Sequence, residues 1–156
     1  MTTFEIVPNP DAPQITVGKM ACDMEFSPKP PEPCPCKSFC WTIVGSRGSG
    51  KSTYLRSLIS SKKKDARIYY KCFHSVIVCM PSHSRASMTP DPFKGIPEED
   101  LYEEFDETFM DEVEAKVKQN ATEGIFTLII FDDISNSLRN NRTLENRITK
   151  LVHLSR

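Results

Sequence analysis

The stretch "IVGSRGSGKSTYL", Ile43–Leu55, decides the fold of this chain. It joins a short apolar run to a glycine-rich turn and then to a helix-like segment, and residues 45–52 fit the pattern G-x-x-x-x-G-K-[ST] without departure. Glycines allow backbone angles that other residues avoid, so the N–H groups of such a loop can surround a phosphate. The helix that follows adds its positive N-terminal dipole. The stretch therefore predicts a phosphate-binding loop between a strand and a helix.

This P-loop, or Walker A motif, divides the work of holding a nucleoside triphosphate among its side chains. We expect the Lys51 ammonium to lie on the β- and γ-phosphates and the Ser52 hydroxyl to be a ligand of Mg²⁺. Thr53 is expected near the α-phosphate. The predicted ligands are ATP and Mg²⁺, and the predicted binding residues are Gly45, Ser46, Arg47, Gly48, Ser49, Gly50, Lys51, Ser52 and Thr53.

Arg47 lies inside the loop, and two interpretations of it stay open. Its guanidinium can reach the γ-phosphate from within the same subunit, which would make it catalytic. It fits equally well as a solvated loop arginine, because arginines are mostly exposed.

A second motif, "TLIIFDDI" (Thr127–Ile134), is an apolar run that ends in two acids, as a Walker B motif does. A buried strand of this kind delivers carboxylates to the carboxyl edge of a parallel sheet, where ligands bind. We expect Asp132 to hold Mg²⁺, directly or through water, and Asp133 to polarise the attacking water. Asp133 also fits a helix N-cap or a loop carboxylate, because aspartate is a favoured cap.

Composition places the chain among single-domain globular proteins: it has 156 residues, 38% of them apolar and 26% charged, with a formal net charge of −1. This balance gives no global electrostatic argument for nucleic acid or membrane binding. No apolar run approaches the roughly 18 residues of a membrane span, and the N-terminus lacks the build of a secretory signal. We therefore expect an intracellular protein with no membrane partner.

The six cysteines give no sign of an oxidising compartment. Cys72 and Cys79 lie in or beside an apolar run and are expected to be buried free thiols. Cys34, Cys36 and Cys40 form a C-x-C-x₃-C cluster that could hold a metal, but no fourth ligand is obvious nearby. We favour incidental thiols over a metal site.

The first 35 residues hold eight of the twelve prolines, which excludes a regular helix or a central strand there. We interpret residues 1–37 as an extended or partly disordered N-terminal arm, which either packs on the core or reaches a neighbouring subunit. Residues 38–156 then form a P-loop ATPase domain.

Strand-like and helix-like segments alternate through this domain, which predicts an α/β fold with a mainly parallel sheet flanked by helices. Because three strands make a thin sheet, we expect further strands to be missing at the C-terminal side. The expected strands are Phe39–Gly45, Ser75–Met80 and Phe126–Asp133; the expected helices are Lys51 to about Ser61, Glu98 to about Asn120 and about Thr143 to the end, with a loop over Ser82–Pro97.

The P-loop alone leaves GTPases, small-molecule kinases, AAA-type machines and translocases open. No N-K-x-D motif follows, which weakens the case for a GTPase, and the 82–97 loop carries only Arg85 where nucleotide kinases have an arginine-rich lid. The acidic strand end with "DDISNS" favours a hydrolysing, motor-type ATPase.

Five stretches in their order, "WTIVGSRGSGKSTYLRSLI", "SVIVCMPSHS", "EEDLYEEFDE", "TLIIFDDI" and "ENRITKLVHLSR", resemble the poxvirus-type virion DNA-packaging ATPases of large double-stranded DNA viruses. These belong to the FtsK–HerA superfamily of P-loop motors, and the resemblance covers about residues 39–156. It implies a RecA-like core in which Lys51, Asp132 and Asp133, with Arg47 as a candidate, serve ATP hydrolysis.

The resemblance also implies a homo-oligomeric ring that drives double-stranded viral DNA into a preformed capsid, with viral capsid components as partners. The expected location is the virion or the host-cell cytoplasm, in the viral factory. Such motors carry a sensing glutamine on a strand after the acidic one and an arginine that reaches the neighbouring subunit. The chain ends before that glutamine strand, which predicts a C-terminal truncation, and Arg156 is a candidate for the arginine.

DNA contact has the least support from the residues themselves. Ser60–Arg67 and Leu138–Arg147 are basic stretches of the kind that bind phosphate backbones, but solvated helix ends explain both equally well. Two alternative functions remain open: a nucleoside, nucleotide or small-molecule kinase, and a non-catalytic nucleotide-binding fragment.

Overall fold

A sheet of three parallel strands lies at the centre of the computed structural model, which describes residues 25–46, 48–62, 67–89, 91, 93–139 and 141–154. The strand order is β2-β1-β3, with β1 at Ser75–Cys79, β2 at Leu101–Tyr102 and β3 at Thr127–Phe131. β1 and β3 pair in parallel along their whole length, from Ser75 opposite Thr127 to Cys79 opposite Phe131. The predicted α/β fold with a parallel sheet is confirmed.

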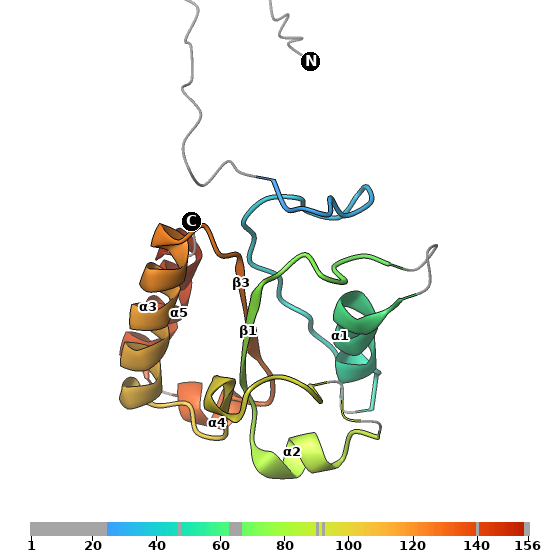
Figure 1. Ribbon diagram of the computed structural model, residues 1–156. Helices are drawn as coiled ribbons and strands as arrows, with labels where there is room; N and C mark the ends of the chain where they lie inside the picture. Colours follow the sequence, from blue (N-terminus) through green and yellow to red (C-terminus); the bar gives the residue numbers. More distant parts are fainter. Residues whose placement is uncertain are drawn as a thin grey trace, which may run out of the picture.

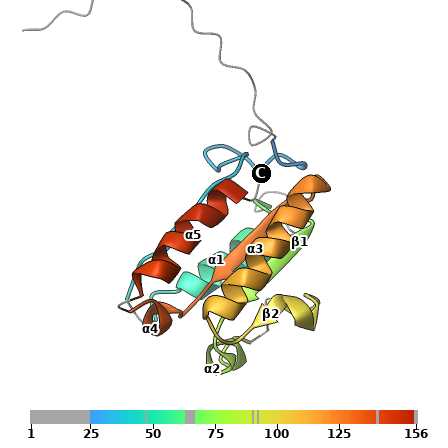
Figure 2. The ribbon, with the colours of Figure 1, turned by 90° about the vertical axis from the view of Figure 1, so that its left-hand side faces the viewer.

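Helices cover both faces of this sheet (Figures 1 and 2). α1 (Lys51–Ser60) lies on one face, while α3 (Glu107–Thr122) and α5 (Arg142–Leu154) lie side by side on the other. Two short helices, α2 (Ser82–Ala86) and α4 (Ser135–Leu138), follow the carboxyl ends of β1 and β3. In Figure 1 they lie at the same end of the sheet as the start of α1.

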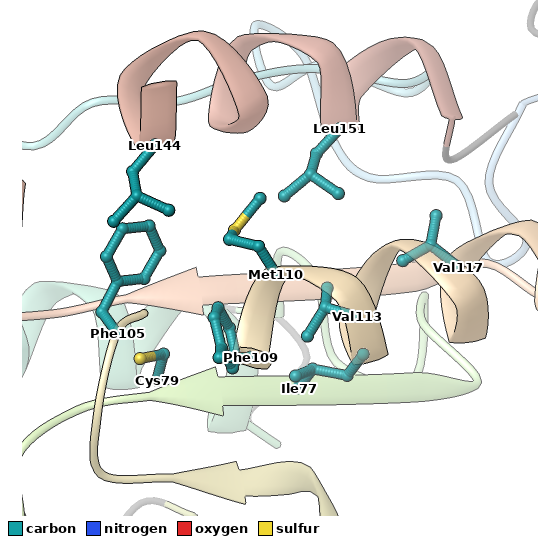
Figure 3. Close-up of a cluster of buried hydrophobic side chains, with 9 residues drawn as sticks. All are labelled: Ile77, Cys79, Phe105, Phe109, Met110, Val113, Val117, Leu144 and Leu151. Atoms are coloured by element: carbon teal, nitrogen blue, oxygen red, sulfur yellow. The ribbon is translucent and has the colours of Figure 1, made fainter. Parts of the chain in front are cut away.

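The alternation of side chains along the strands places apolar side chains against the helices on both faces of the sheet, as a period of two requires. Ile77 and Cys79 of β1 point to the α3 and α5 side, whereas Val78 points to the α1 side. Figure 3 shows the core on the α3 and α5 side, in which α3 contributes side chains at four-residue spacing. The members of that core are Ile77, Cys79, Phe105, Phe109, Met110, Val113, Val117, Leu144 and Leu151.

The predicted strand Phe39–Gly45 is wrong: this segment is irregular, and its Val44 side chain is 87% exposed. A cavity of about 420 Å³ separates the segment from β3, with Trp41 and Ile43 on one side and β3 residues on the other. A strand needs a neighbour within hydrogen-bonding distance. In the described part of the chain this segment has none, although its composition is typical of a strand.

The predicted helix Glu98–Asn120 is correct only in its second part. Glu98–Asp100 form a 3₁₀ turn, η3, and the next two residues form β2, which pairs with Val78–Cys79 of β1. α3 begins after Asp106, whose carboxylate accepts a hydrogen bond from the Phe109 N–H at 2.8 Å. This N-cap fixes the start of the helix, and strand pairing competes for the residues before it.

The segment that leads into the domain buries an aromatic side chain, Phe26, against it. Phe26 is 6% exposed and lies edge-on to Phe73 and Phe126, with ring centroids 5.1 and 5.2 Å away. Its N–H donates to the Cys36 carbonyl at 2.8 Å. Residues 1–24 of the predicted arm lie outside the described residues.

None of the described helices is both long and apolar enough to cross a membrane.

Candidate functional site

The glycine-rich loop before α1 has the backbone conformation that its sequence predicts. Gly48 and Gly50 have φ angles of 77° and 85°, in the left-handed region that favours glycine. At Gly45 a Cβ atom would lie 2.5 Å from the Ser49 Oγ, so the Ser49 hydroxyl would have to rotate away. A turn closes between them, with the Ser49 N–H donating to the Ser46 carbonyl at 3.2 Å. The described loop residues are exposed, so the loop is open to a ligand.

Lys51 is the first residue of α1, and its side chain folds back over the loop. Its Nζ donates to the carbonyl oxygens of Gly45 at 2.9 Å and Ser46 at 3.0 Å. The ammonium therefore lies across the loop at the positive end of a helix, where an anion is favoured. Phosphate oxygens would replace these neutral carbonyls as partners of the cation.

The central contact of the site joins the loop to the acidic strand end. The Ser52 Oγ donates to the Asp132 Oδ2 at 2.9 Å, across 80 residues of sequence. The sheet fixes Asp132, because its N–H donates to the Cys79 carbonyl at 3.1 Å and so extends the β1–β3 ladder. A hydroxyl and a carboxylate oxygen at this separation fit the oxygen ligands that Mg²⁺ takes in phosphate sites. The residues present therefore fit both a triphosphate and its metal.

Asp133 faces a different element from Asp132. Its φ angle is 58°, and its Oδ2 accepts a hydrogen bond from the Ser84 Oγ of α2 at 2.8 Å. His83 Nε2 lies 3.9 Å from the same oxygen. Asp133 is not the N-cap of α4, which is Ile134, but it does lie in the loop between β3 and that helix, as the other interpretation of a loop carboxylate requires.

Of the predicted residues that the structure describes, Thr53 is not part of this contact network. Thr53 is exposed on the first turn of α1, and its described contact is a backbone one, the Ser57 Oγ donating to its carbonyl at 3.0 Å. Arg47 and Arg156 lie outside the described residues. The structure therefore brings Lys51, Ser52 and Asp132 to one place, with Asp133 on its border.

Sequence reasoning missed His83 and Ser84. In the sequence Ser84 lies 49 positions before Asp133, and although His83 and Ser84 close the stretch "SVIVCMPSHS", the sequence assigned neither of them a role. The signal that was present is their position directly after β1, at the sheet edge to which the acidic strand end also belongs.

The cysteine predictions have different outcomes. Cys72 and Cys79 are free and fully buried, as expected, and burial raises the pKa of Cys72 and raises that of Cys79 to about 12. Cys34 and Cys36 are half-buried, and Cys40 is exposed. Within the described residues, no group of three or more His, Cys, Asp or Glu side chains is placed to hold a metal.

One arginine of the second basic stretch, Leu138–Arg147, forms ion pairs within the domain. Arg147 on α5 donates to Glu114 at 2.7 Å and to Asp111 at 2.6 Å, both on α3. These hydrogen bonds raise the pKa of the guanidinium. Arg147 thus ties α5 to α3. In the first stretch, Lys62 and Arg67 lie over the Tyr70 ring at 6.0 and 5.3 Å, and residues 63–66 are outside the described residues.

Comparison with known proteins identifies the family of this chain. The sequence model of one family, described as Poxvirus A32 protein, matches residues 35–155, which include the loop, both acids and every described helix and strand. No curated protein and no solved structure gives a significant match. A match over most of the chain shows its family: this chain belongs to the poxvirus A32 family, the family of poxvirus virion packaging ATPases.

Proposed function

We propose that this chain binds ATP with Mg²⁺, hydrolyses it, and works as a motor that translocates double-stranded viral DNA into the capsid. The observation that carries the proposal is the bond between Ser52 Oγ and Asp132 Oδ2. It places the two oxygen ligands expected for Mg²⁺ beside a loop whose glycines and lysine suit phosphates. Family membership supports the packaging role.

Each residue of the site has a distinct role in this proposal. Lys51 neutralises the β- and γ-phosphates, and Ser52 and Asp132 hold the metal, which when bound withdraws charge from the phosphate oxygens. Asp133 orients and polarises the attacking water. Arg47 keeps its two interpretations, a γ-phosphate contact or a solvated loop residue.

The partners are proposed from the family. Packaging motors act as rings of identical subunits around double-stranded DNA and work with capsid components, in the virion or the infected-cell cytoplasm. The structure supplies one constraint on the DNA contact, because the charge of Arg147 is already balanced by two acids of α3. Arg139 and Arg142, which are exposed, are the better candidates in that stretch.

Nucleotide binding tests the proposal at its base. We expect ATP with Mg²⁺ to bind the wild-type chain, Lys51→Ala to abolish binding, and Asp132→Asn to remove its dependence on Mg²⁺. Lys118→Ala, an exposed lysine on α3, is the matched control and should bind as the wild type does. Equal binding by wild type and Lys51→Ala would refute the site.

The reaction products separate hydrolysis from the kinase alternative. We expect phosphate released to water from the wild-type chain, and Asp133→Asn to retain ATP while blocking its hydrolysis. Transfer of phosphate to a nucleoside or another small acceptor would instead establish a kinase. Tight ATP binding without any turnover would favour a non-catalytic nucleotide-binding chain.

A further inference from the structure

The proposal of a water-polarising role for Asp133 leaves open what holds its carboxylate. Asp133 follows the end of β3, and its side chain is 57% exposed. An exposed carboxylate next to solvent samples several orientations unless a partner fixes it. A carboxylate that orients the attacking water must keep a single one of these orientations.

Helix α2 supplies the partner. The Ser84 Oγ donates to the Asp133 Oδ2 at 2.8 Å, and the His83 Nε2 lies 3.9 Å from that same oxygen. The His83 side chain is 80% exposed, so its contact is screened by water and the serine contact dominates. Within the described residues no hydrogen bond uses the other oxygen, Oδ1, which is thus available to a water molecule.

The sheet fixes the position of α2 relative to Asp133. β1 and β3 end at paired residues, Cys79 and Phe131, so the segments that follow them meet at one edge. α2 then begins directly after Pro81, whose carbonyl accepts from the N–H of Ser84 at 3.0 Å. The serine therefore reaches Asp133 from an anchored turn.

The backbone of Asp133 points to the same conclusion. Its φ angle of 58° is uncommon for a residue with a Cβ atom, although aspartate tolerates it better than most. Asp132 bonds to α1, whereas Asp133 bonds to α2, so this backbone turn sends two consecutive carboxylates to different elements. Strained conformations of this kind cluster at functional sites.

We propose that Ser84 is a positioning residue for ATP hydrolysis, which holds Asp133 so that its Oδ1 faces the attacking water. This inference rests on the proposed function. In the step concerned, the water oxygen bonds to the γ-phosphorus, and the bond from that phosphorus to the bridging oxygen breaks with its electron pair on ADP. Oδ1 accepts a hydrogen bond from the water, whose proton leaves with the phosphate product.

Steady-state ATP hydrolysis by the full chain tests the inference. We expect Ser84→Ala to lower kcat on the order of tenfold or more, because a hydrogen bond to a charged acceptor is lost, and to leave KM within about twofold. Ser84→Thr, which keeps a hydroxyl, should restore most of the rate. Ser82→Ala, an exposed serine of the same helix, is the matched control and should equal the wild type. A Ser84→Ala rate equal to or above that of the wild type would overturn the inference.

ATP binding and hydrogen exchange distinguish positioning from general damage to the fold. If Ser84 acts through Asp133, Ser84→Ala should bind ATP with Mg²⁺ as tightly as the wild type, as Asp133→Asn is also expected to do. Hydrogen exchange should rise in residues 82–87 of Ser84→Ala and stay unchanged elsewhere. Weakened ATP binding by Ser84→Ala, or exchange in α2 that is unchanged in it, would contradict the inference. Absence of turnover in the wild type overturns the proposed function and this role with it, whereas normal turnover in Ser84→Ala overturns only the role.

Discussion

Replacing Gly50 tests whether the loop must adopt its left-handed backbone to bind phosphate. Gly50 has a φ angle of 85°, and a Cβ atom added there would meet nothing within 4 Å. The change Gly50→Ala therefore adds conformational strain and no clash. A residue with a Cβ atom in the left-handed region costs roughly 1–2 kcal/mol, which corresponds to a factor of about 5 to 30 in an equilibrium constant.

The exposed loop can escape this strain by leaving the left-handed region, and it must return there to surround a phosphate. We therefore expect Gly50→Ala to weaken ATP binding about 5- to 30-fold while the free energy of unfolding changes little. Gly50→Asn should weaken binding less, because asparagine tolerates this region better. Isothermal titration with ATP and Mg²⁺, together with urea unfolding, measures both quantities.

Gly124 gives a matched control. It follows α3 with a φ angle of 72°, a Cβ atom there would also meet nothing within 4 Å, and its N–H donates to the Ala121 carbonyl at 3.3 Å. Because backbone hydrogen bonds from the N–H groups of Gly124 and Ile125 hold this turn against the end of α3, Gly124→Ala should lower the free energy of unfolding by about 1–2 kcal/mol and leave ATP affinity unchanged. The reasoning would be refuted if Gly124→Ala lowers the free energy of unfolding as expected but Gly50→Ala leaves the ATP affinity unchanged.

Two further predictions concern buried groups. Because burial raises the pKa of Cys79 from 9.0 to about 12, the thiol ionises in the unfolded chain before it does in the folded one. The free energy of unfolding should therefore fall as pH rises from 9 towards 12. Cys79→Ala should reduce that slope in urea unfolding, and an identical slope would contradict the assignment. Lys116 pairs with Asp100, whose side chain is 8% exposed, so Lys116→Met leaves a buried carboxylate without its cation. We expect a loss of about 2 kcal/mol in unfolding free energy, against almost none for the exposed Lys118→Met, and equal stabilities of the two variants would show that the pair is dispensable.

Local chemistry explains which parts of the site were predictable. The conformation of the loop follows from glycines at fixed spacing, and Ser52 lies where the helix begins. The apolar runs of β1 and β3 are long enough to be identified as buried strands, and their parallel pairing brings Asp132 to the loop. The Ser84 contact with Asp133 was not predicted, because no motif fixes how α2 and the turn after β3 meet at the edge of the sheet.

Strand pairing and helix capping explain where the secondary structure predicted from the sequence was wrong. Phe39–Gly45 has the composition of a strand, but a ladder forms only between neighbours, and a cavity lies between this segment and β3. In the segment 98–120, four-residue apolar spacing continues from Leu101 into α3 and concealed the boundary. The Asp106 cap and the pairing of β2 with β1 decide that boundary, and only the capping residue is visible in the sequence.

Phosphate release from ATP in the presence and absence of double-stranded DNA tests the central claim most directly. The wild-type chain should release phosphate in a Mg²⁺-dependent reaction that DNA accelerates. Asp133→Asn should bind ATP but release almost no phosphate, and Lys51→Ala should neither bind ATP nor release phosphate. A wild-type chain that binds ATP but hydrolyses it no faster than Asp133→Asn, with or without DNA, would contradict the claim that this site drives a DNA motor.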